Sequence, residues 1–209
     1  MSNRIHGALA VLAALVALLA LPAAGSARPS VASPGVGINY STLPGLQTGA
    51  VPWAADDGKT LRARLDRLGL PVLGAEQLDY HIHAHLDIYV RGVQIPVPAL
   101  VGIDVVDEFL TVLHTHDATG IVHIESATNH HYQLGDFFGV WGVRLSGTCI
   151  GSYCARQSAK VRVWVNGKPY TKNPAGIVMR EHDEIVLSVG TKGDLPNPIP
   201  KRYKWQAGL

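Results

Sequence analysis

Residues 81–90 read HIHAHLDIYV, in which polar or aromatic side chains alternate with apolar ones. Strict alternation over ten residues predicts a β-strand, because successive side chains of a strand point to opposite faces. The apolar positions would face a core. The opposite face would carry three imidazoles about 6.5–7 Å apart along the strand, followed by an acidic and an aromatic side chain; these are His81, His83, His85, Asp87 and Tyr89.

A second histidine-rich segment, at residues 111–125, reads TVLHTHDATGIVHIE. It predicts a hairpin of two strands, 111–116 and 121–125, joined by a four-residue loop. If His116 pairs with Ile121, His114 lies opposite His123, and directly opposed residues share a face. Glu125 would project to that same face, whereas a slip of one residue would scatter the set.

Other patterns complete a mainly β fold. Asp56 or Asp57 could cap a helix that ends at Gly69, and Leu134–Trp141 predicts a short core helix. Further strands are expected at 93–97, 160–165 and 184–189, and Asn166-Gly167 is a hairpin signal. We therefore expect antiparallel sheets, arranged as a sandwich or a barrel-like structure, with one or two short helices.

The two ends of the chain differ from its middle in composition. Arg4, an apolar run and a group of small residues predict a signal peptide over 1–27, since the run is shorter than the ~20 residues of a membrane span. The alternative is a retained anchor. We expect an exported protein, periplasmic, extracellular or at the cell surface, with no stable membrane insertion after cleavage. The further regions are a linker (28–55), a histidine-rich β region (56–131), a C-terminal β-hairpin region with a short helix (132–192) and a proline-rich tail (193–209).

The charge and the cysteines narrow the function classes. The chain has 18 Lys and Arg against 16 Asp and Glu, so its net charge of +2 gives no basic surface for nucleic acid. Its two cysteines, Cys149 and Cys154, lie in CIGSYC. In an oxidising compartment such a pair predicts a local disulfide. A redox role is less favoured, because the spacing is not C-x-x-C.

Eight of the ten histidines fall between His81 and His131. Neutral imidazole is a common ligand of transition metals. The two segments together predict a metal site, and Glu125, Asp117 or Asp87 could complete it or orient its ligands. Histidines outside the two strand segments, at 130, 131 and 182, are expected to be structural. The candidate ligands are His83, His85, His114, His116, His123 and His81.

Cu(II) or Zn(II) is the expected metal. Cu(I) prefers sulfur ligands, and after signal cleavage the chain would keep a single methionine, Met179, and no free thiol. The alternative is a set of buried, hydrogen-bonded histidines without metal.

The chain resembles a group of uncharacterised secreted bacterial proteins that share segments similar to HIHAHLDIYVRG, LHTHDATGIVHIE, YQLGDFFGVWG and VNGK. The resemblance covers residues 61–190 and implies one module, with no established activity. A cupin motif around His114 and His116 is absent, because Glu108, Gly120 and Ile121 stand where it requires Gly or Glu. An α-type carbonic anhydrase is similar in its ligand arrangement only.

Three functions fit these patterns. The first is a module that binds, delivers or senses a transition metal. The second is a secreted metalloenzyme with three histidines and an exchangeable water. The third is an exported interaction domain with structural histidines. Protein partners are not indicated by the sequence, which leaves the metal ion as the predicted partner.

Overall fold

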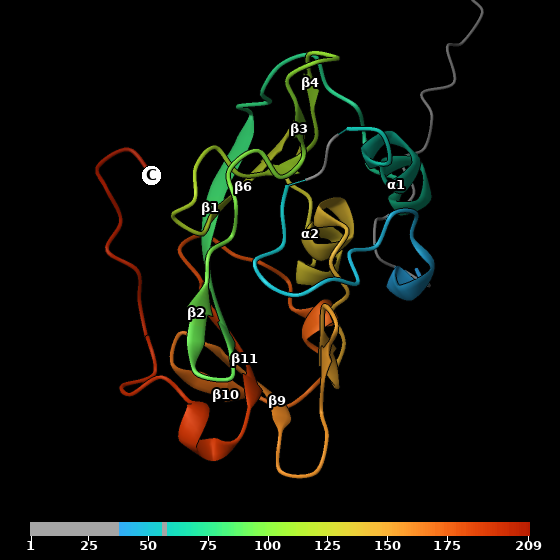
Figure 1. Cartoon of the computed structure of the whole chain (residues 1–209). Helices are drawn as coiled ribbons and strands as arrows, with labels where there is room; N and C mark the ends of the chain where they lie inside the picture. The colour runs from blue at the N-terminus through green and yellow to red at the C-terminus, as the bar shows by residue number, and fades with distance from the viewer. Residues whose placement is uncertain (1–37, 56–57) are drawn as a thin grey trace, which may run out of the picture. The chain divides into compact units, whose positions relative to one another are not determined.

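The computed structural model describes residues 38–55 and 58–209, which belong to one compact unit. The predicted signal peptide lies outside these residues. A seven-stranded sheet dominates the fold, in the order β10-β9-β11-β1-β6-β5, with β2 also paired to β1 (Figure 1). Its strands are β1 (Tyr80–Val90), β2 (Val93–Ile95), β5 (Leu113–His114), β6 (Ile121–Ser126), β9 (Lys160–Val165), β10 (Lys168–Tyr170) and β11 (Glu184–Gly190).

Short elements surround this sheet. Two small antiparallel sheets pair β3 with β4 and β7 with β8. The strands are β3 (Ile103–Asp104), β4 (Phe109–Leu110), β7 (Cys149–Ile150) and β8 (Tyr153–Cys154), the α-helices are α1 (Leu61–Leu68) and α2 (Leu134–Trp141), and the 3-10 helices are η1 (Tyr40–Thr42), η2 (Pro174–Gly176) and η3 (Lys192–Asp194). The expected mainly β fold with short helices is confirmed.

The main sheet is mixed rather than purely antiparallel. β1 and β11 run parallel, and their register places His85 opposite Glu184. These two residues are 99 positions apart, so no local turn pattern could predict the pairing of β1 with β11. A parallel pair needs a long crossover connection, and here the connection contains β6, β5 and α2.

The apolar face of β1 lies against a core that α2 completes. Ile88 of β1 is fully buried. Phe137, Phe138 and Trp141 of α2 are each at most 1% exposed. Helix α2 begins and ends where the sequence pattern predicts. Its last turn is followed by Gly142 in the left-handed conformation, with φ of 74°, which glycine adopts without steric cost.

Helix α1 ends at Gly69, as expected, because that residue takes the left-handed φ of 67°. It begins at Leu61, after Thr60, rather than directly after Asp56 or Asp57. Those two aspartates lie outside the described residues. The buried guanidinium of Arg64 donates to the carbonyl of Val140 near the end of α2, which joins the two helices.

The segment 38–55 packs against the body, although its composition suggests a linker. Leu43 and Trp53 are buried, and the Tyr40 hydroxyl donates to Asp136 at 3.0 Å. Large apolar side chains in a proline- and glycine-rich stretch therefore anchor it.

The predicted disulfide between Cys149 and Cys154 is present and closes the β7–β8 hairpin. Within the described part of the chain, no helix is long and apolar enough to cross a bilayer.

Candidate metal centre

Three neighbouring strands bring the histidines to one face of the main sheet. β5 pairs with β6 so that His114 lies opposite His123, the register that the hairpin pattern predicts. β6 pairs with β1 so that His123 lies opposite His83 and Glu125 opposite His81. Because directly opposed residues share a face, this double pairing gathers side chains from two histidine-rich segments.

Four side chains form the first group of donors: His114, His116, His123 and Glu125. One nitrogen or oxygen of each lies within 4.8 Å of the others. The Nε2 atoms of His114 and His116 are 3.2 Å apart, and Glu125 Oε1 lies 3.5 Å from His114 Nε2 and 3.4 Å from His123 Nδ1. A tetrahedral zinc ion with bonds of about 2.1 Å would separate its ligand atoms by about 3.4 Å, so these spacings fit one small cation.

The ring of His114 is held in the tautomer that a metal needs. Its Nδ1 lies 2.9 Å from the carbonyl oxygen of Thr111, which can only accept. Nδ1 therefore carries the proton, and the lone pair of Nε2 points into the group. An imidazole oriented through its second nitrogen by a backbone carbonyl is the usual arrangement of a metal ligand.

Several polar atoms of the cluster are buried without a hydrogen-bond partner. They are both carboxylate oxygens of Glu125, Nδ1 of His123 and Nε2 of His83. Glu125 has no exposed surface at all. The neighbouring imidazoles lie near its Oε1 but do not reach it with hydrogen-bond geometry. Buried polar groups are almost always satisfied, so these four exceptions mark a place where a ligand could bind.

The electrostatics of the cluster favour the neutral form of two imidazoles, those of His83 and His116, beside an ionised Glu125. Burial, followed by the nearby His123 and His81, lowers the pKa of His83 to about 4. Burial and the neighbours His114 and His123 also lower the pKa of His116. Burial alone would raise the pKa of Glu125, but the surrounding histidines lower it overall. These are the protonation states in which the side chains bind cations.

A second group of donors, His81, His83 and His123, adjoins the first and shares His123 with it. The imidazole centroid of His83 is 4.5 Å from that of His81 and 4.6 Å from that of His123. His81 also approaches Glu125 of the first group, because its Nε2 lies 3.2 Å from Glu125 Oε1. His81 is part exposed, whereas His83 is buried.

His85 does not join this cluster, although its position in β1 predicts that it would. Its Nδ1 lies 3.0 Å from Glu184 Oε2, and its Nε2 lies 2.9 Å from the carbonyl oxygen of Thr119. The carbonyl can only accept, and the two contacts engage both ring nitrogens. Despite burial, these contacts with Glu184, Asp87 and Thr119 raise the pKa of His85. With both ring nitrogens engaged in these contacts, His85 offers no free donor atom to the histidine cluster.

The other predicted participants also lie outside the two groups. Asp117 binds the backbone and hydroxyl of Thr119 within its own loop. Asp87 accepts from Gln94 at 2.7 Å and forms, with His85 and Glu184, a third and buried group of possible metal donors apart from the histidine cluster. Of the three candidate orienting residues, Glu125 alone is a member of the histidine cluster.

The proline-rich tail contributes contacts that the sequence patterns did not identify. Tyr203 stacks on His85 with ring centroids 3.9 Å apart, and Trp205 stacks on His182 at 4.5 Å. Trp205 also lies 6.4 Å from the ring of His83. Figure 1 shows this C-terminal segment in red on the side of β1 opposite α2. The tail therefore covers part of the histidine face. Its aromatic residues were the feature of the sequence that could have indicated this packing.

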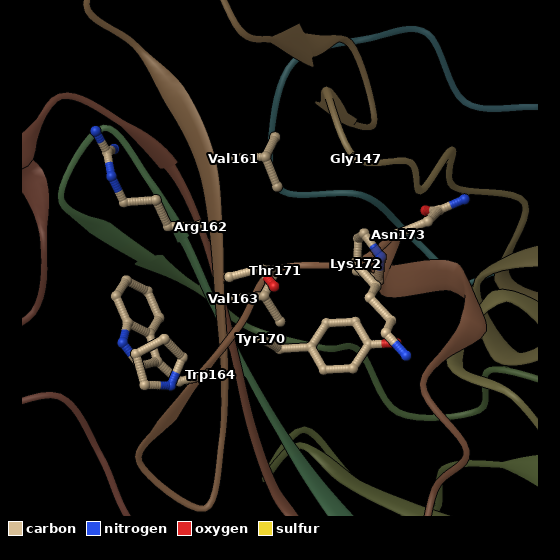
Figure 2. Close-up of a pocket in the computed structure, with 11 residues that line it drawn as sticks. Gly147, Val161, Arg162, Val163, Trp164, Tyr170, Thr171, Lys172 and Asn173 are labelled. Atoms are coloured by element: carbon tan, nitrogen blue, oxygen red, sulfur yellow. The ribbon is translucent and has the colours of Figure 1, made fainter.

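A surface pocket of about 580 Å³ lies elsewhere, along β9 and β10 (Figure 2). Its lining includes Val163 and Tyr170, whose side chains lie on one side of the β9 ribbon, and Arg162 and Trp164, whose side chains lie on the other. None of the described residues that line this pocket is a histidine or a carboxylate. The possible metal ligands are therefore gathered at the histidine cluster and not in this pocket.

Comparisons of the chain with models of protein families, with curated proteins and with solved structures found no match. The function is therefore inferred from the histidine cluster itself.

Proposed function

We propose that this is an exported protein that binds a transition metal through histidines on β1, β5 and β6, in order to carry, deliver or sense it. The observation that carries the proposal is the convergence of His114, His116, His123 and Glu125 within 4.8 Å, with buried polar atoms that lack partners. Structural histidines would have partners for these atoms.

Cu(II) and Zn(II) suit the donor set best. Imidazole and carboxylate are ligands of intermediate or hard character, whereas Cu(I) prefers thiolate or thioether. Both cysteines are joined in the disulfide, and Met179 is buried in the core cluster. The disulfide also supports an oxidising, exported location.

Elemental analysis of the purified exported protein tests the proposal. After loading with Zn²⁺ or Cu²⁺ and dialysis against a weak chelator, we expect at least one equivalent of metal to remain. His114→Ala should retain at least one equivalent less than the unmodified protein, while the matched control His131→Ala, which removes an exposed histidine, should retain as much as the unmodified protein. Retention well below half an equivalent by the unmodified protein would refute metal binding.

A metalloenzyme is the second candidate, and the exposure of His116 favours it. That side chain is 43% exposed and lies beside Glu76, so the cluster is accessible to water on that side. A catalytic zinc keeps one position for an exchangeable water, whereas a structural zinc is closed by four protein ligands. X-ray absorption of the zinc-loaded protein distinguishes the two by counting imidazole and water ligands.

A further inference from the structure

The donors on the histidine face are too many and too spread out for one ion. Six side chains take part, in two groups that share His123. The ring of His123 lies centrally, 4.6 Å from that of His83 on one side and 4.4 Å from that of His116 on the other. A tetrahedral ion takes four ligands, and the first group supplies four by itself.

The donors left over are built as ligands. When His114, His116, His123 and Glu125 hold one ion, His81 and His83 remain. His83 is only 4% exposed, and its Nε2 is buried without a partner. Its ring lies 4.5 Å from that of His81 and 4.6 Å from that of His123, so an unpartnered nitrogen here is a donor available to a second ion.

Glu125 lies between the two groups and can serve both. Its Oε1 is 3.2 Å from His81 Nε2 in one group and 3.5 Å from His114 Nε2 in the other. Both of its oxygens lack hydrogen-bond partners, and Oε1 is the oxygen that lies near both groups. A carboxylate in this position offsets part of the repulsion between two dications, which in two-metal sites lie about 3.5–4 Å apart.

Resting on the proposed function, we infer that the histidine face is a dinuclear site, with two transition-metal ions bridged by the Glu125 carboxylate. His114 and His116 hold the first ion, and His81 and His83 hold the second. His123 lies beside both and completes one of them. The partly exposed rings of His81 and His116 leave room for water to fill the remaining positions.

Stoichiometry separates this inference from the proposed function. Metal-free protein is titrated with Zn²⁺ by calorimetry and with Cu²⁺ by electron paramagnetic resonance. We expect two equivalents of either ion. At two equivalents the Cu²⁺ signal should be weaker than that of two isolated ions, or broadened, because ions bridged by one carboxylate interact magnetically.

Variants assign the two positions. His83→Ala should bind one equivalent and give the spectrum of an isolated Cu²⁺. His81→Ala should do the same and keeps the test available if His83→Ala does not fold, since His81 is the more exposed ring. The matched control His131→Ala should still bind two.

One equivalent in the unmodified protein would overturn the dinuclear inference and leave the proposed function intact. No binding would overturn both. Two equivalents without magnetic interaction, or with one lost in His131→Ala, would show that the second ion binds elsewhere and would also overturn the inference.

Discussion

Removing His114 is the sharpest test of the site, because its ring is fully buried and oriented by the carbonyl of Thr111. Mutation of a residue that only orients a metal ligand lowers metal affinity by about 10–100-fold. The loss of a buried ligand should cost at least 100-fold. We therefore expect His114→Ala to abolish the stabilisation that the ion held by His114 gives to the folded protein.

The size of this effect follows from mass action. At a free Zn²⁺ concentration of about 100 times Kd, binding stabilises the native state by about 2.7 kcal/mol. For a chain of this size each kcal/mol shifts Tm by about 2–4 °C, so this ion should raise the Tm of the unmodified protein by about 5–10 °C. A 100-fold weaker site at the same concentration contributes only about 0.4 kcal/mol, a gain of about 1 °C.

The assay is thermal unfolding followed by circular dichroism, with and without Zn²⁺. Each variant is compared with its own metal-free state, because His114→Ala also leaves a cavity in the fold. His131→Ala is the control and should gain as much as the unmodified protein. His116→Ala, at a more exposed ring, replaces His114→Ala if the latter does not fold. An equal gain in all variants would show that the metal binds outside the cluster.

Three further predictions concern other parts of the molecule. The pKa of His83, about 4, lies below that of a free imidazole, so the unfolded chain takes up a proton first as the pH falls. Urea unfolding of metal-free protein should therefore show a loss of stability between pH 7.5 and pH 5 that depends on His83, and His83→Asn should reduce this slope, whereas an unchanged slope would contradict the low pKa. His85→Asn should leave the metal stoichiometry unchanged in calorimetry, because both nitrogens of His85 are engaged by Glu184 and Thr119; a lost equivalent would contradict that reasoning. Cu²⁺ should quench part of the tryptophan fluorescence through Trp205, 6.4 Å from His83, and Trp205→Phe should remove that part, whereas unchanged quenching would place the ion away from the tail.

The local patterns of the sequence predicted much of the fold. Alternation in residues 81–90 and 160–165 gave strands, and Asn166-Gly167 gave a turn in which both residues have positive φ. The hairpin loop at 117–120 set the register of His114 opposite His123. Such features depend on side-chain periodicity and turn chemistry over a few residues, which a sequence displays directly.

Local patterns did not predict that two segments with little periodicity pack against the rest of the fold. The stretch 38–55 has the composition of a linker, yet it buries Leu43 and Trp53. The proline-rich tail likewise brings Tyr203 and Trp205 onto the histidine face. In both cases single aromatic or apolar side chains provide the contacts, and their partners are distant in the sequence.

The sequence by itself determined that β1 carries three histidines on one face and that the β5–β6 hairpin presents more. Only the tertiary structure decided how these donors are divided. His83 and His85 are equivalent in the strand pattern, but pairing with β6 brings His83 to His123, whereas pairing with β11 brings His85 to Glu184. The physical reason is that burial of apolar side chains in the common core determines which strands pair. The strand pairing then determines which side chains become neighbours on the polar face.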